Sequence, residues 1–253
     1  MTRTARNTRA AQAAAQTAPR ASQRAPGAAT HGADSASAWR RGRKRLRDHG
    51  VKRDAVVQVA ARAFAERGYH NTSLDDIAKA LDVTKPTIYY YVTNKEQLLF
   101  QCFVTGLEPI RAALRAVKMS KQPARERLNT VLRQYAQAVA SDFGWCMVIA
   151  EHQDLSASMS DHIRALKVEI DQGVRRLLRE GVKDGSVQPC DVKMTAFALA
   201  GALNWIAHWY RANQGMTAGQ VADSFVTIFE EGLRPRAARR KSVTRAKPRP
   251  TNP

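Results

Sequence analysis

Across residues 52–233, apolar side chains recur every three or four positions, and this period constrains the fold more than any other feature. In a helix such spacing gathers the apolar side chains into one stripe along a single face. A half-buried strand would instead alternate apolar and polar residues, and the sequence has no alternating run bounded by hairpin turns. The pattern therefore predicts an all-α fold.

The first two predicted helices are short and close together. One covers about residues 52–67 and stops at Gly68, because glycine readily takes the left-handed conformation that ends a helix. The next covers about 73–81, and either Thr72 or Ser73 can cap its first turn. Both helices have an apolar stripe, so they are expected to pack against each other.

A tight turn at Asp82 leads to a third helix that ends near Val92. Thr84 is expected to cap it, and Pro86 lies in its first turn, where a missing N–H costs nothing. Ile88 and Val92 point inward on this helix. Three short helices with a tight turn before the last are the arrangement that places a recognition helix in the DNA major groove.

Breaker residues divide the rest of the chain into further helices. Asn94 is expected to cap a long fourth helix. The remaining predicted helices lie at about 123–141, 143–152, 158–182, 189–211 and 217–232.

Four sequence segments in unbroken order make the first of these regions recognisable. They are FAERGY at 64–69, TSLDDIA at 72–78, VTKPTIYYYV at 83–92 and NKEQLL at 94–99. This run closely resembles the DNA-binding domain of the TetR family of bacterial repressors. The resemblance implies a helix-turn-helix DNA-binding domain at 51–100, followed at 101–233 by a helical domain that binds a ligand and dimerises.

Two positions depart from the family pattern without threatening it. Asp82 stands where the turn commonly has glycine, and aspartate tolerates the left-handed conformation better than most residues. Pro86 stands where glycine is frequent, and it fixes the start of the helix.

The DNA-contacting residues are expected on the exposed side of the third helix and beside it. A lysine can donate to guanine acceptors or to phosphate, and tyrosine offers a ring for thymine methyls and a hydroxyl for phosphate. Tyr91 fits core packing as well as DNA contact. The candidates in this region are Thr72, Ser73, Lys85, Pro86, Thr87, Tyr89, Tyr90, Tyr91 and Lys95.

The net charge of +19 is concentrated at the two ends of the chain. Residues 1–53 carry a net charge of +11 and residues 234–253 a net charge of +8, whereas 54–233 is neutral. Residues 1–50 and 234–253 have little to bury and are predicted to be disordered basic segments. A DNA minor-groove arm is predicted just before the first helix, and a solvated linker is the alternative. The arm residues are Arg43, Lys44, Arg45 and Arg47.

The second domain is expected to provide a dimer interface from its last two helices. Two apolar helices per protomer would form a four-helix bundle across a two-fold axis, and a dimer matches a palindromic operator. The alternative is that these side chains form the core of one protomer. The interface candidates are Leu199, Leu203, Ile206, Phe225, Ile228 and Phe229.

A small-molecule effector pocket is expected in the same domain, lined by apolar side chains with a few polar groups. Segments 150–156 and 202–211 are similar to a TetR subgroup that senses acyl-CoA thioesters, which would make the effector an acyl-CoA. The pocket candidates are Phe100, Phe103, Leu107, Trp145, Met147, Ile149, Glu151, Trp205, His208 and Trp209.

Other classes of protein find little support in the sequence. It has no HExxH, P-loop, nucleophile elbow or dinucleotide fingerprint, so we expect neither an enzyme nor a cofactor or metal site. The most apolar stretch, 195–210, is shorter than the ~20 residues that cross a bilayer. Three scattered cysteines without a CxxC pair indicate reduced thiols in the cytoplasm, where a DNA-binding protein would associate with the nucleoid.

Two alternatives remain open. Residues 1–30 contain no apolar segment typical of a secretory signal, although their composition also fits a transit peptide. A non-specific architectural DNA-binding protein that relies on its basic ends would have no need of a shaped recognition helix or a neutral second domain. Strong preference for one palindrome would exclude it.

Overall fold

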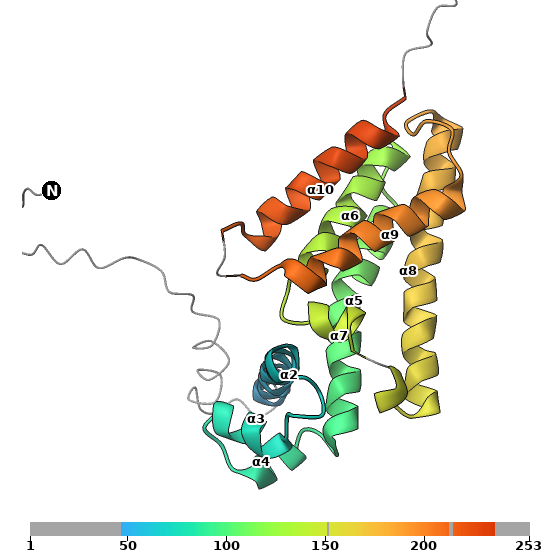
Figure 1. The fold of residues 1–253 in the computed structure, drawn as a ribbon. Coiled ribbons are helices and arrows are strands. Elements are labelled where there is room, and N and C mark those ends of the chain that lie inside the picture. Colours follow the sequence, from blue (N-terminus) through green and yellow to red (C-terminus); the bar gives the residue numbers. More distant parts are fainter. Residues whose placement is uncertain (1–46, 151, 213–214, 236–253) are drawn as a thin grey trace, which may run out of the picture.

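The computed structural model describes residues 47–150, 152–212 and 215–235, and over these residues the chain is helical without any strand (Figure 1). The all-α prediction is confirmed. None of the described helices combines the length and apolar character needed to cross a membrane. The elements are α2 (Arg47–Arg67), α3 (Leu74–Ala80), α4 (Lys85–Tyr89), α5 (Lys95–Val117), α6 (Ala124–Val139), α7 (Gly144–Val148), the 3₁₀ turn η1 (His152–Asp154), α8 (Ala157–Asp184), α9 (Val192–Trp209) and α10 (Ala218–Leu233).

Helices α2, α3 and α4 form a compact module at one end of the molecule (Figure 1). Its core consists of side chains with no exposed surface or almost none, including Phe64, Ile77, Leu81 and Ile88. Burying a side chain of this size is worth about 1.5–3 kcal/mol, which holds α3 and α4, two helices too short to be stable alone, against α2.

The turns of this module take the conformations that the sequence predicts. Gly68 has a φ of 81° where α2 ends, and Asp82 has a φ of 56° between α3 and α4. Aspartate is thus held in the left-handed region that glycine would favour. The turn sets the angle between α3 and α4 without a glycine.

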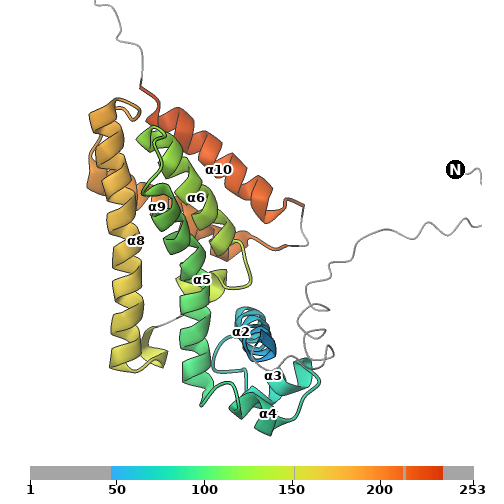
Figure 2. The same cartoon turned by 180° about the vertical axis from the view of Figure 1, so that it is seen from behind.

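Helix α5 connects the module to the larger helical domain. It begins beside α4 and continues between α6 and α8, so the boundary predicted near residue 100 falls inside a continuous helix (Figures 1 and 2). At 1.5 Å per residue its 23 residues span about 35 Å. A rigid element of this length links the two parts of the molecule mechanically.

The larger domain is a bundle in which α6 is central. It packs against α5, α8, α9 and α10, whereas α8 runs along one side of the bundle (Figure 2). The short helix α7 is wedged between α2, α5 and α9. Its tight fit depends on two glycines, because a Cβ on Gly106 would overlap Met147 and Phe143, and a Cβ on Gly144 would overlap the Val139 carbonyl oxygen.

Most of the predicted helix starts are confirmed. Ser73 caps α3 and forms a reciprocal capping box with Asp76, and Thr217 does the same with Gln220 on α10. The Asn94 side chain accepts a hydrogen bond from the Gln97 N–H, 2.7 Å away.

Thr84 occupies the predicted cap position of α4, although its hydroxyl makes no capping hydrogen bond and instead lies 2.9 Å from the Thr87 hydroxyl. One predicted helix start is wrong. Helix α9 does not begin at Pro189, since Asp191 caps it by accepting from the Met194 N–H at 3.0 Å. A carboxylate satisfies a free N–H at the first turn, which proline cannot do.

Candidate functional site

The exposed face of α4 carries three of the predicted DNA-contacting side chains. Tyr89 and Tyr90 are 49% and 72% exposed, and Lys85 also faces solvent. On the opposite side, Ile88 and Val92 are buried in the module core, as predicted. Burial of one face fixes the orientation of the helix, so the polar face is presented in one direction.

The Lys85 ammonium is paired with a carboxylate of the neighbouring helix. Its Nζ lies 2.9 Å from Oδ2 of Asp75 on α3. The hydrogen bond from Lys85 to Asp75, together with the negative charge of Asp75, raises the pKa of Lys85 above its usual range. The lysine is therefore charged, and it reaches across the angle between α3 and α4.

Lys95, at the start of α5, is held by neutral groups. Its Nζ donates to the Tyr69 carbonyl at 3.0 Å and lies 4.3 Å from the centre of the Tyr69 ring. Between the two lysines an open groove of about 420 Å³ is lined in part by Ser73, Asp75 and Tyr89. Two lysines and a tyrosine hydroxyl on one groove provide donors that can contact DNA, at base edges or at phosphates.

Other DNA-contacting candidates have structural roles in the module. Thr72 is buried, and its hydroxyl donates to the carbonyls of Ala63 and Gly68, so its side chain does not reach the surface. Tyr91 is half-buried against the core, with its ring edge-on to the ring of Tyr90.

Three candidates lie at the α3 and α4 helix starts. Ser73 caps α3, Pro86 occupies the first turn of α4, and Thr87 pairs with Thr84. The predicted minor-groove arm lies outside the described residues: Arg43, Lys44 and Arg45 precede them, and of Arg47 only the backbone, at the start of α2, is described.

The larger domain contains a cavity of about 210 Å³ between α5, α6, α7, α8 and α9. Two of the predicted pocket residues, Leu107 and Met147, line it. The lining residues that the prediction missed are Tyr135, Val148, Lys167, Ile170 and Asn204. The available signal was the interruption of an apolar helix by Asn204, but its partners lie on helices far away in the sequence.

The cavity holds two polar features. The Tyr135 hydroxyl donates to Oδ1 of Asn204 at 3.0 Å, and burial raises the pKa of Tyr135 to about 12. Burial also lowers the pKa of Lys167, whose Nζ lies 5.4 Å from the ring centre of Phe103. An apolar wall with an ammonium and a hydroxyl can orient a ligand that has an oxygen acceptor.

Three predicted pocket residues on α9 lie elsewhere, and their assignment to the pocket is corrected. Trp205 is 62% exposed and stacks on His208 with ring centres 4.5 Å apart, and Trp209 is also exposed. They occupy the outer face of α9, because the opposite face is the one packed into the bundle.

The remaining pocket candidates are not among the residues that line the cavity. Phe103 is fully buried beside it, and Phe100 packs its ring against that of His162, 5.4 Å away. Trp145 and Ile149 are half-buried, and Glu151 lies outside the described residues.

The α9 part of the predicted dimer interface also requires correction. Leu199, Leu203 and Ile206 are buried in the protomer's own core and cannot contact a partner. The outer face of α9 presents a second set of apolar side chains, and on α10 Ile228 is 65% exposed, whereas Phe225 and Phe229 are half-buried. The exposed set on α9 is Met194, Phe197, Trp205 and Trp209.

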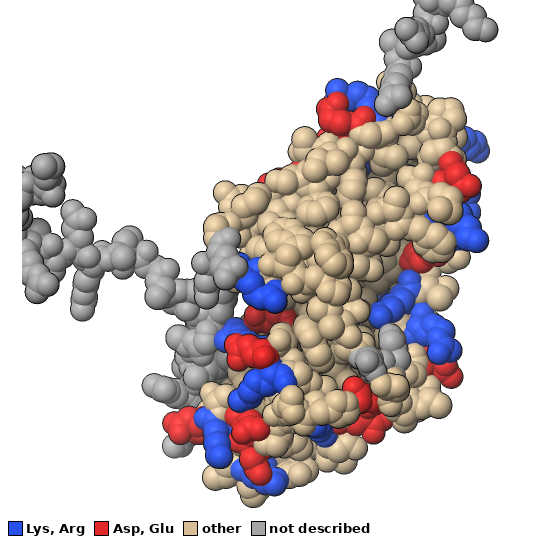
Figure 3. Space-filling view, in the orientation of Figure 1, with Lys and Arg blue, Asp and Glu red and all other residues tan. Residues whose placement is uncertain are grey.

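This outer face of α9 and α10 is almost free of charged side chains, whereas charges crowd the α2–α4 end of the molecule (Figure 3). Contiguous exposed apolar surface is typical of interaction sites.

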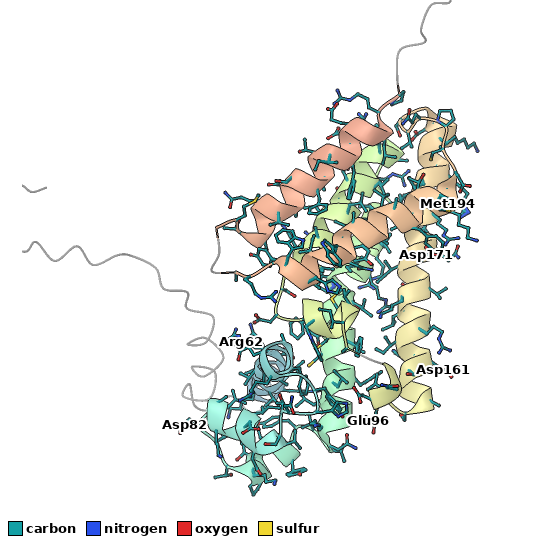
Figure 4. All side chains as sticks on the ribbon, in the orientation of Figure 1. Arg62, Asp82, Glu96, Asp161, Asp171 and Met194 are labelled. Atoms are coloured by element: carbon teal, nitrogen blue, oxygen red, sulfur yellow. The ribbon has the colours of Figure 1, made fainter. Side chains whose placement is uncertain are left out.

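Polar contacts between described residues join the two parts of the molecule. Arg62 on α2 donates to Asp142 before α7 at 2.8 Å, and Glu96 at the start of α5 accepts from the Ser156 N–H at 2.7 Å. His70 Nε2 lies 3.1 Å from Oδ1 of Asp154 in η1. Arg62 and Glu96 lie on the side of the module that faces the bundle (Figure 4).

Comparison with known proteins agrees with this arrangement. Residues 56–102 match the family model described as bacterial regulatory proteins, tetR family, and residues 121–233 match the one described as tetracyclin repressor-like, C-terminal domain. The chain is 26% identical over 189 residues to the HTH-type transcriptional repressor KstR2 of Rhodococcus jostii (strain RHA1), a match that covers 72% of this chain and 91% of that protein.

Solved structures give the same result. The TetR family transcriptional regulator PfmR from Thermus thermophilus superposes with a TM-score of 0.64 at 27% identity, covering 71% of this chain and 99% of that one. AibR in complex with isovaleryl coenzyme A and operator DNA superposes with a TM-score of 0.59 at 27% identity, covering 70% and 96%. The two family models, the relatives and the helical arrangement lead to one conclusion: the chain belongs to the TetR family of DNA-binding transcriptional regulators.

Proposed function

We propose that the protein is a homodimeric repressor that binds a palindromic operator and leaves it when a small-molecule effector enters the cavity. The observation that carries the proposal is the polar face of α4, where Lys85, Tyr89 and Tyr90 point outward from a helix anchored by Ile88. A helix held in this way can enter the major groove and present donors to base edges.

Dimerisation is supported by the uncharged outer face of α9 and α10. Exposed tryptophans are costly on a monomer surface and are enriched where interfaces are most strongly bound. Packing Trp205 and Trp209 against the same face of a second copy would bury them around a two-fold axis. Such a pair of recognition helices matches two half-sites of a palindrome.

The effector that we propose is a short-chain acyl-CoA, with its acyl end in the cavity. A cavity of about 210 Å³ has room for a short acyl group. The Lys167 ammonium can donate to a carbonyl oxygen there. The solved AibR structure holds isovaleryl coenzyme A, which supports this ligand class.

The structure also suggests how the cavity would be coupled to DNA binding. Met147 and Val148 of α7 line the cavity, and α7 follows directly after Asp142, the partner of Arg62 on α2. A shift of α7 upon ligand binding would move the DNA-binding module of one protomer relative to that of the other protomer. A ligand acts in this way only if it binds one arrangement better than the other.

Footprinting on the DNA upstream of the protein's own gene and its divergent neighbour tests the proposal. We expect one discrete protected palindrome, and loss of protection when isovaleryl-CoA or a related short acyl-CoA is added. Diffuse protection at every concentration would contradict sequence-specific binding and favour the architectural alternative. Protection that no acyl-CoA relieves would contradict the effector assignment alone.

The dimer is tested by Trp205→Glu, which places a charge on the outer face of α9. We expect the mass in solution to halve and the affinity for the full palindrome to fall by at least tenfold, because one half-site contact is lost. Val168→Glu is the matched control, since Val168 is 52% exposed on α8. Equal masses for the wild type and the Trp205→Glu variant would overturn this interface.

A further inference from the structure

The recognition helix carries a single cation, and that cation is neutralised within the module. Lys85 is the only Lys or Arg in α4, and its Nζ is 2.9 Å from the Asp75 carboxylate. Both side chains are about half exposed and border the groove that also includes Tyr89 and Lys95. The ion pair therefore lies on the surface proposed to face DNA.

Asp75 has no part in capping its own helix. The capping box at the start of α3 is formed by Ser73 and Asp76, whose carboxylate accepts from both the backbone N–H and the hydroxyl of Ser73. The side chain of Asp75 points to Lys85 instead. Its charge can be removed without removing the cap.

The two lysines of the groove, Lys85 and Lys95, differ in the charge of the groups that hold them. Lys95 is bound to the carbonyl and ring of Tyr69, which are neutral, so its charge is available to any phosphate that approaches. Lys85 must share its ammonium between Asp75 and DNA. A phosphate that approaches Lys85 also approaches the Asp75 carboxylate, and like charges at such distances repel.

Lys85 can contact the edge of a base without losing its bond to Asp75. The ammonium has three N–H donors, so Lys85 can keep one hydrogen bond to Asp75 and direct the other two to acceptors such as O6 and N7 of guanine. These acceptors carry only partial negative charge, so Asp75 repels them far less than it repels a phosphate. The pair therefore favours a base contact over a phosphate contact for the same lysine.

We propose that Asp75 is a specificity-determining residue, which restrains Lys85 from binding phosphate on random DNA while permitting its contact with a base of the operator. This proposal rests on the proposed function, because it assumes that α4 reads an operator. It assigns the role to a residue that does not itself need to touch DNA.

The test is Asp75→Asn, measured with the full chain on the footprinted operator and on a random duplex over a series of salt concentrations. On the random duplex we expect about fivefold tighter binding and a salt slope steeper by about 0.9, which corresponds to one more neutralised phosphate. Operator affinity should change by less than about twofold, so discrimination between the two duplexes falls about fivefold.

Two controls separate this role from a general loss of negative charge. Asp54→Asn removes the same charge from the exposed surface of α2 and should leave the random-duplex slope unchanged. In a Lys85→Ala background, Asp75→Asn should have no further effect on that slope. A slope that rises equally in Asp54→Asn, or that still rises without Lys85, would overturn the proposal.

Two other results would also overturn it. An unchanged random-duplex slope in Asp75→Asn would mean that Asp75 does not restrain Lys85, and a large loss of operator affinity would make Asp75 a contact residue. Absence of any preferred operator for the wild type would instead refute the proposed function. In that case the random-duplex slopes still report whether Asp75 restrains Lys85.

Discussion

At the scale of single residues, Tyr135 shows how a buried polar group makes stability depend on pH. Its hydroxyl donates to Asn204, and burial raises its pKa from 10.0 to about 12. Between these two values the unfolded chain loses the phenol proton while the folded protein keeps it. The stabilisation is therefore complete below pH 10 and is lost as pH rises towards 12, by about 3 kcal/mol in total.

Tyr135→Phe should remove this part of the pH dependence. At neutral pH we expect it to cost about 1 kcal/mol, because Asn204 loses its partner. Between pH 10 and 12 the free energy of unfolding should fall less steeply for the variant than for the wild type, as measured by urea denaturation. Parallel curves for the two proteins would show that the phenol ionises normally and is accessible to water.

At the scale of elements, the corner between α6 and α7 depends on a close approach of two backbones. A Cβ at Gly144 would overlap the Val139 carbonyl oxygen, which belongs to the backbone and cannot rotate away. Gly144→Ala must therefore displace α7 or the end of α6. We expect a loss of about 1–3 kcal/mol, seen as a lower Tm at fixed protein concentration.

Gly232→Ala in α10 is the control for this prediction, since beyond its own helical turn and chain neighbours the added Cβ meets nothing within 4 Å. Alanine in a helix is favoured over glycine by about 0.5–1 kcal/mol, so this variant should be equally or slightly more stable. If both variants had the same Tm, α7 would not be held as tightly as the structure indicates.

At the scale of the whole molecule, the net positive charge lies outside the part of the chain that forms most of the helical fold. Residues 54–233 are neutral, whereas residues 1–53 carry +11. The part of the chain from residue 54 onward therefore offers little long-range attraction for DNA. We expect attraction from a distance to come from the basic segment before α2.

Deletion of residues 1–46 should flatten the salt dependence of operator binding, by about 0.9 in slope for each phosphate contact that is lost. Fluorescence anisotropy at several salt concentrations measures it, with deletion of residues 236–253 as the comparison. The second deletion should have the smaller effect if only the N-terminal segment acts as an arm. An unchanged slope in the first deletion would refute the arm.

The sequence by itself determined what depends on neighbours along the chain. Helical periodicity predicted the all-α fold. Residue type predicted the cap at Asn94, the turn at Asp82 and, as one of two candidates with Thr72, the cap at Ser73, because each depends on contacts within about four residues. The sequence also predicted which face of α4 is buried. Ile88 is apolar among polar neighbours, so only one face could be buried.

The tertiary structure decided what depends on partners far away in the chain. Helix α9 is apolar on two faces, so the spacing of its apolar residues could not show that Leu203 packs inward and Trp205 outward. The cavity joins Tyr135, Lys167 and Asn204 from three helices, and the ion pair of Asp75 with Lys85 spans a turn. The spacing of apolar residues along the sequence determines which face of a helix is apolar. The packing of the whole chain determines which residues that face contacts.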